Sequence, residues 1–233
     1  MGESIKRIIG PYQDSYSPNG IIGEKDACGV GFIANINGIE SNWILKQSLK
    51  GLNCMEHRGG CGGDSDSGDG AGILCSIPWQ YLDEEMNLKN KKDFDRGLGM
   101  VFMPNKKEKI EECKSICEEE AEKLRINKTS WRTVPVNNEI LGPLAKANAP
   151  FISQWILYID QKYKHDIERL LFQLRKRIEK KIREAFKNHV GDCEFYFASL
   201  SSQTVVYKGM VRSEILSEFY QDLKEENFKV SFS

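Results

Sequence analysis

The sequence has no long apolar run and no excess of charge of either sign. The leading residues hold only isolated apolar pairs, Ile8-Ile9 and Ile21-Ile22. A signal peptide needs a longer apolar core, and a membrane span needs about 18 apolar residues, so neither is expected. Basic residues number 33 and acidic residues 34, for a net charge of −1. This balance gives no footprint for a nucleic acid or a membrane surface, and we expect a cytoplasmic protein.

Histidine is scarce, and the cysteine spacing does not indicate a disulfide framework. Seven cysteines make an odd set without regular spacing, which suits reduced thiols rather than disulfides. Cys113 and Cys117 lie four apart on an expected helix. No histidine or second cysteine pair is spaced to complete a zinc site with them, so we interpret both as core residues and expect no metal.

What the sequence does contain is an apolar strand that opens with a cysteine, residues 28–36. Cys28 shares one expected face with Val30, Phe32, Ala34 and Ile36, while two glycines leave the other face bare. Glycines in a strand often mark the close approach of a ligand or of another backbone.

Cys28 is a candidate nucleophile whose base is its own α-amino group. An α-amino group has a pKa of about 7.7–8.0, which suits a base at neutral pH. That group exists only if residues 1–27, a stretch rich in turn-forming residues, are removed as a propeptide. The alternative is a buried structural cysteine behind an ordinary ragged N-terminus.

Hydrophobic periodicity predicts alternating helices and strands along the rest of the chain. A helix begins near Ser41, a plausible N-cap. The clearest helix covers residues 165–190, where apolar residues repeat at helical spacing. Further helices are expected over residues 106–124 and 214–223. Strands are expected over residues 73–78, 98–103, 131–136, 151–159, 194–200, 203–208 and 228–233.

A loop rich in glycine and aspartate follows the first helix. Its Asp64-x-Asp66 start resembles a calcium loop, but glycine stands at the third ligand position and Cys75 at the twelfth, where a glutamate belongs. No Gly-Lys-Ser/Thr follows, so a phosphate-binding P-loop is excluded as well.

Several motifs, taken together and in order, resemble the beginning of the glutamate synthases, large ammonia-assimilating enzymes. The resemblance covers nearly everything from Asp26 onward. The motifs are Cys-Gly-Val-Gly-Phe at 28–32, Met-Glu-His-Arg-Gly-Gly at 55–60, Asp-Ser-Gly-Asp-Gly-Ala-Gly-Ile at 66–73, Trp-Arg-Thr-Val-Pro-Val at 131–136, Leu-Gly-Pro at 141–143, and the run at 198–210.

This resemblance implies a class II glutamine amidotransferase domain of α+β class. Its expected fold is the N-terminal-nucleophile (Ntn) hydrolase αββα four-layer sandwich, here incomplete at its C-terminal end. Residues 1–27 would be the propeptide and residues 28–233 the first part of the domain. The family's nucleophile corresponds to Cys28, which attacks the side-chain amide of L-glutamine and releases ammonia. Arg58 corresponds to the arginine near the substrate and the nucleophile, where a cation favours the thiolate.

The resemblance also places several functional parts beyond Ser233. These are the glutamine-clamping arginine, the Asn-Gly pair of the oxyanion hole, and the synthase domains with FMN and an iron–sulfur cluster. No cofactor is therefore expected in residues 1–233, and we expect these residues alone to be inactive, with an unpaired final strand. The expected partners are the downstream domains and ferredoxin, which is favoured over a nicotinamide as electron donor. In a eukaryote the location could be the plastid stroma. The alternative function is a non-catalytic amidotransferase-like segment that acts in folding or subunit interaction.

Overall fold

A computed structural model describes residues 29–55, 70–88, 94–163, 165–186 and 195–233. Strands and helices mix along the chain, and every strand pair is antiparallel. Four strands form one sheet in the order β3-β4-β2-β5, and two more form the pair β1-β6. The α+β class expected from the sequence is therefore confirmed. The strands are β1 (Ala71–Ser76), β2 (Phe94–Met103), β3 (Lys128–Thr133), β4 (Phe151–Asp160), β5 (Tyr196–Ser201) and β6 (Thr204–Gly209).

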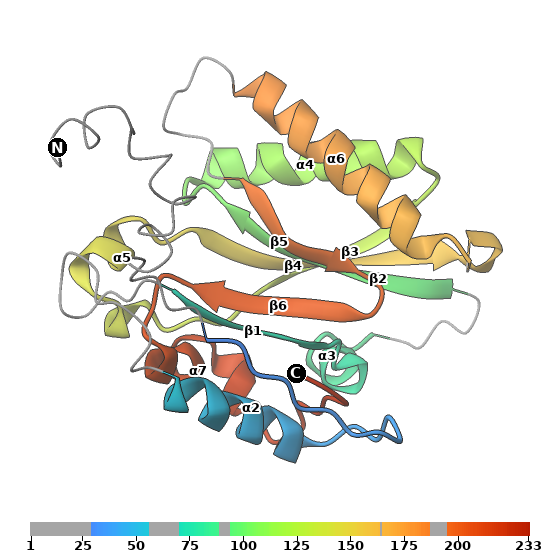
Figure 1. Ribbon diagram of the computed structural model, residues 1–233. Helices are drawn as coiled ribbons and strands as arrows, with labels where there is room; N and C mark the ends of the chain where they lie inside the picture. The colour runs from blue at the N-terminus through green and yellow to red at the C-terminus, as the bar shows by residue number, and fades with distance from the viewer. Residues whose placement is uncertain (1–28, 56–69, 89–93, 164, 187–194) are drawn as a thin grey trace, which may run out of the picture.

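Two long helices cover one face of the four-stranded sheet (Figure 1). Helix α4 (Lys107–Lys123) and helix α6 (Ile167–Ala185) pack there against alternate residues of β2 and β4, and together they enclose one apolar core. Cys113 and Cys117 are buried in this core, which confirms their interpretation as core residues. Trp155 of β4 stacks on Trp131 of β3 in the same layer, with ring centroids 5.2 Å apart.

A second core lies on the other side of the four-stranded sheet. It joins that face to the β1-β6 pair and to the helices drawn below the pair in Figure 1. These helices are α2 (Asn42–Cys54), α3 (Trp79–Glu85) and α7 (Leu216–Phe219), and α5 (Pro143–Ala147) lies at one end of the molecule. Ser41 caps α2 as expected, because its hydroxyl accepts a hydrogen bond from the backbone N–H of Ile44.

One expected helix and one expected strand take other forms. The helix over 214–223 is broken into α7 and two 3₁₀ turns, η5 (Ser213–Ile215) and η6 (Gln221–Lys224). Tyr220 is extended there and bridges Val136, which interrupts the helix. The strand expected at the C-terminal end of the chain was predicted to be unpaired, and that was wrong. Ser231 and Ser233 hydrogen-bond to the backbone of Asn35 and Ile33.

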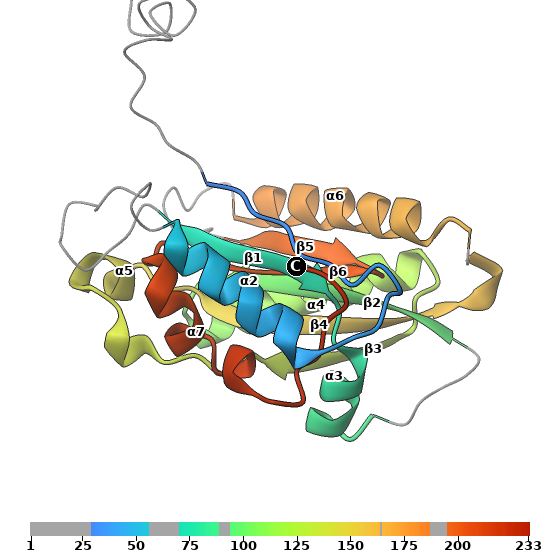
Figure 2. The ribbon, with the colours of Figure 1, turned by 60° about the horizontal axis from the view of Figure 1, so that its bottom comes forward.

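The stretch over residues 29–35 is extended, and its side chains alternate between two faces as predicted. Val30 is 92% exposed and Phe32 79% exposed, whereas Ile33 packs against the core. The face that holds Val30 and Phe32 is the exposed one, and the sequence had not indicated which face meets the core. Figure 2 shows this segment running beside β1 and α2, close to the C-terminal end of the chain.

Candidate functional site

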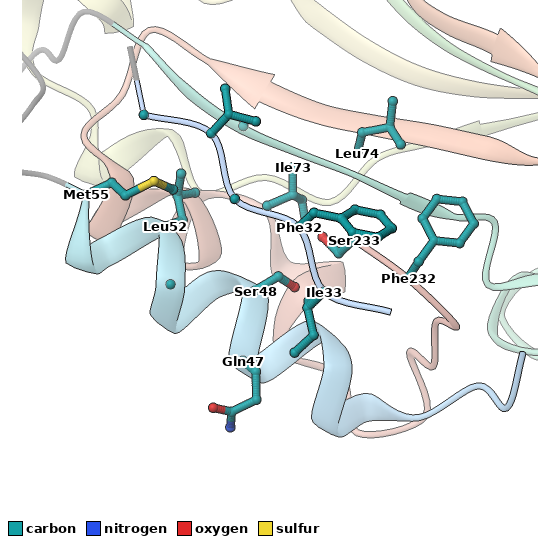
Figure 3. A pocket seen from close by; sticks show the side chains of 15 residues that line it. Phe32, Ile33, Gln47, Ser48, Leu52, Met55, Ile73, Leu74, Phe232 and Ser233 are labelled. Atoms are coloured by element: carbon teal, nitrogen blue, oxygen red, sulfur yellow. The ribbon is translucent and has the colours of Figure 1, made fainter. Parts of the chain in front are cut away.

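The candidate site lies between the extended segment 29–33, β1 and α2. A cavity of about 500 Å³ opens there, bordered by Gly31 and Phe32 on one side, by Gly72 and Leu74 on another, and by Met55 at the end of α2. Figure 3 shows segment 29–33 passing in front of α2 and running in the same direction as β1, with Ser233 between the two. Gly29, which follows Cys28 in the chain, is the first of the described residues that line the cavity.

Gly29 fixes how closely this segment can approach α2. A β-carbon added at Gly29 would lie 2.9 Å from Sδ and 3.1 Å from Cβ of Met55. The Sδ atom belongs to a flexible side chain and can move, but the Cβ–Cβ distance is tighter than an ordinary contact, so a side chain at position 29 would require Met55 or the segment to shift. Met55 is the C-cap of α2, and its N–H hydrogen-bonds to the carbonyl oxygens of Asn53 and Leu52. The contact thus joins the start of the extended segment to the end of a helix.

The two residues predicted to carry the chemistry, Cys28 and Arg58, lie outside the described residues. Their neighbours in the chain are described and are in contact. Gly29 directly follows Cys28, and Met55 precedes Arg58 by three positions. The described geometry therefore brings together the two backbone segments from which the predicted nucleophile and the predicted cation extend.

A second close approach holds β1 against β6. A β-carbon at Gly72 would lie 2.8 Å from Cβ of Lys208 and 2.9 Å from the carbonyl oxygen of Tyr207. This position therefore requires glycine, and it explains one glycine of the run that the sequence interpretation treated as a loop. The strand begins at Ala71, earlier than predicted.

The cavity lining that the structure describes is mostly apolar and carries no charged side chain. Its polar side chains are those of Gln47, Ser48 and Ser233. The Ser48 hydroxyl already donates within α2, to the carbonyl oxygens of Ile44 and Leu45. None of these described lining side chains is a cation that would form an ion pair with the α-carboxylate of an amino acid.

The cysteines inside the described core are poor nucleophiles. Burial raises the pKa of the Cys75 thiol to about 12. Burial, together with the neighbouring Cys113, holds the pKa of Cys117 well above its usual value. A thiol needs its thiolate form to attack, so both are inert at neutral pH.

A buried polar network near the site was missed by the sequence interpretation. The fully buried Asp222 accepts two hydrogen bonds of 2.8 Å from the Arg132 guanidinium, and others from the hydroxyls of Tyr81 and Tyr207. Tyr207 of β6 in turn accepts a hydrogen bond of 2.9 Å from Gln154 of β4. Burial and the nearby Asp222 raise the pKa of Tyr207, so it stays neutral. The network ties the β1-β6 pair to the larger sheet. A buried Arg–Asp pair so far apart in sequence leaves no local signal.

Two further observations concern metal-binding groups and membrane-spanning helices among the described residues. Among the described residues, no group of three or more His, Cys, Asp or Glu side chains is arranged to hold a metal ion. No helix in the described ranges combines the length and the apolar character needed to cross a bilayer.

Comparison with known proteins agrees with the sequence motifs. A family model described as "Glutamine amidotransferases class-II" matches residues 28–233. The ferredoxin-dependent glutamate synthase of Oryza sativa, named as chloroplastic, is 42% identical over 227 residues, covering 96% of this chain and 14% of the relative. Ferredoxin-dependent glutamate synthase 1 of Arabidopsis thaliana is 43% identical over 217 residues, covering 91% of this chain and 13% of the relative. Ferredoxin-dependent glutamate synthase 2 of Synechocystis gives the same identity and the same coverage. The chain thus spans about one seventh of the length of the curated relatives it matches.

Proposed function

Because this chain belongs to the class II glutamine amidotransferases, we propose that it is the glutaminase part of a ferredoxin-dependent glutamate synthase. The observation that carries the proposal is the contact of Gly29 with Met55. It holds the residue after Cys28 against the helix end that leads to Arg58. The family match, which begins at residue 28, supports the same assignment. The four-layer αββα arrangement of the Ntn hydrolases is part of this proposal.

In the proposed reaction, removal of residues 1–27 gives Cys28 a free α-amino group. That amine takes the thiol proton, and the thiolate attacks the side-chain amide carbon of L-glutamine. The tetrahedral intermediate expels ammonia, which leaves with a proton returned by the α-ammonium group, and a γ-glutamyl thioester remains. Water then hydrolyses the thioester to L-glutamate and restores the thiol. The Arg58 guanidinium, near the sulfur, favours the thiolate and the developing negative charge.

In the longer enzyme the ammonia would serve the reductive synthesis of L-glutamate from 2-oxoglutarate. FMN, an iron–sulfur cluster and the contact with ferredoxin belong to other domains in this proposal. A cluster needs a set of cysteine ligands, and the described residues provide none. We place the enzyme in the cytoplasm, or in the plastid stroma of a eukaryote.

Replacement of the nucleophile tests the proposal. Cys28→Ala in the longer enzyme should lower glutamine-dependent glutamate formation by at least about 10³-fold, because no thioester can form. Ammonia-dependent synthesis should persist, since free ammonia bypasses this site. N-terminal sequencing of the active enzyme should begin at Cys28.

Two results would contradict this assignment. Retention of glutaminase activity by Cys28→Ala would favour the non-catalytic alternative, a segment that acts in folding or subunit interaction. Full activity in an enzyme that still begins at Met1 would remove the α-amino base. Cys54→Ala is the matched control, because Cys54 is an exposed cysteine on α2, and it should retain activity.

A further inference from the structure

At one end of the candidate-site cavity, the last residues of the sequence already lie between two neighbouring backbones. Ile33 and Ser233 exchange two hydrogen bonds of 2.9 Å, and the N–H of Asn35 donates to the Ser231 carbonyl. On the other side, the N–H of Ser76 in β1 donates to the Phe232 carbonyl at 3.3 Å. The backbone at 231–233 is thus the middle strand of a short three-stranded arrangement.

Past the position of Ser233, segment 29–33 and β1 continue side by side with the cavity between them. Segment 29–33 forms one edge, and Gly72 and Leu74 of β1 form the other. No backbone hydrogen bond joins Gly29 or Gly31 to another described residue. In β1, Ser76 directs its N–H away from β6, and Gly72 and Leu74 share its alternation, so their N–H and C=O groups also face the cavity.

We propose that this cavity is a slot for one further stretch of β-strand, occupied by the polypeptide that follows Ser233 in a longer chain. Both edges need backbone partners, and an extended backbone is the chemical group that satisfies them together. The curated relatives, of which this chain covers about one seventh, are long enough to supply it. An amino-acid ligand fits less well, because the described lining offers no charged side chain for its carboxylate or its ammonium group.

The existing hydrogen bonds fix the register of the inserted strand. Hydrogen-bonded pairs recur at every second residue of an antiparallel ladder. Counting from the pairs Ile33–Ser233 and Ser76–Phe232, the first added residue pairs with Leu74 and the second with Gly31. The third then pairs with Gly72 and the fourth with Gly29. Successive added residues would thus hydrogen-bond alternately to β1 and to segment 29–33, as successive residues of a central strand do.

The same register fixes which side chains would be covered. The second and fourth added residues share the face of Ile33 and Ile73, which packs on the core. The first and third share the exposed face of Phe32 and Leu74. We therefore expect apolar or small residues at the second and fourth positions after Ser233.

A short extension of the chain tests the slot without any assay of activity. Thr-Val-Thr-Val, fused directly after Ser233, places valine at the two inward positions. Amide hydrogen exchange at Gly29, Gly31, Gly72 and Leu74 should slow by at least about tenfold relative to residues 1–233. The matched control, Val-Thr-Val-Thr, has the same composition but places threonine inward, so it should protect these amides less.

Three outcomes would overturn the proposal. One is unchanged exchange at all four amides with the Thr-Val-Thr-Val extension. Another is equal protection by the two extensions, which would show that the inward and outward faces are not distinguished. The third is protection that develops only together with dimerisation in sedimentation, which would assign the slot to a second copy. None of these outcomes depends on Cys28, so failure of the slot and failure of the proposed glutaminase are distinguishable.

Discussion

Strand β4 and the segment over residues 29–36 are both extended and apolar, yet they have opposite environments. Eight successive residues of β4, 152–159, are buried. In the other segment Val30, Phe32 and Ile36 are almost fully exposed. Strand β4 has β3 and β2 on its two edges, α4 and α6 over one face, and the second core over the other. The 29–36 segment pairs on one edge only among the described residues. Burial is therefore decided by the neighbours that a strand has, and apolar composition alone does not secure it.

The largest effect on stability should come from the removal of a buried charge. Asp222→Ala leaves the Arg132 guanidinium, whose side chain is 8% exposed, without its buried partner. Breaking a buried pair from one side typically costs about 3–5 kcal/mol of unfolding free energy. Urea denaturation followed by circular dichroism measures this cost.

Arg132 provides its own control. Its other ion pair is with Glu85, whose side chain is 46% exposed. Glu85→Gln should cost less than about 1 kcal/mol, since exposed pairs contribute little. Equal losses of unfolding free energy in Asp222→Ala and Glu85→Gln would show that the buried ion pair of Arg132 contributes no more than its exposed one.

A smaller effect, on catalytic activity, is expected from a substitution in segment 29–33. Gly29→Ala in the longer enzyme should lower the glutamine-dependent kcat/KM by about tenfold or more, because the added carbon pushes the segment and Cys28 away from Met55. The second substitution Met55→Ala removes Sδ and Cγ, two of the three close atoms, and should restore part of the loss. Steady-state kinetics with glutamine and with ammonia separates this effect from general damage.

Gly31→Ala is the matched control at the same edge. Its added carbon would meet Met55 Cε at 3.7 Å, an ordinary contact. We expect a smaller loss of kcat/KM than for Gly29→Ala. A loss equal to that of Gly29→Ala would contradict the role of the Met55 contact.

The smallest effect should depend on pH and concerns Glu120 of α4, one of the two helices that cover the four-stranded sheet. Burial by itself would raise the pKa of Glu120, but hydrogen bonds from Lys123 and Arg177 outweigh it and lower that pKa below its usual 4.5. A lowered folded-state pKa means that the carboxylate stabilises the fold at neutral pH and loses this effect as the pH falls through the acid range. Glu120→Gln should therefore lower the Tm at pH 7, with a difference that narrows below pH ~4.

Thermal unfolding at several pH values tests this expectation. The adjacent Glu119 is exposed, and Glu119→Gln should change the Tm little at any pH. A Glu120→Gln difference that stays constant from pH 7 to pH 3 would rule out the proposed ionic contribution.

The sequence predicted well those elements whose signal is local. The apolar stripe of α6, the Ser41 cap of α2 and the apolar run of β4 each lie within a few consecutive residues, and the structure confirms all three. For the segment over residues 29–36 the sequence showed the alternation but not the buried face, because alternation shows that two faces differ, not which one meets the core. The helix over 214–223 was overestimated because the bridge from Tyr220 to Val136 is a long-range contact.

For the site, the sequence predicted residue roles but not surroundings. The motifs indicated Cys28 and Arg58, and these assignments remain predictions because both residues lie outside the described ranges. The contact of Gly29 with Met55 and the Asp222 network could not be predicted, because each depends on elements that meet only in three dimensions. Glycine at position 29 was a partial signal, since it indicated a close approach without naming the partner.

The separation of 90 residues between Arg132 and Asp222 also constrains the order of events during synthesis. Arg132 leaves the ribosome 90 residues before its buried partner. At typical elongation rates of about 5–20 residues per second, that interval lasts several seconds. During it the guanidinium has no Asp222 carboxylate, so burial of the β3 edge is unfavourable. The β3 edge of the four-stranded sheet should therefore become buried only after the 3₁₀ turn η6 (Gln221–Lys224) has emerged.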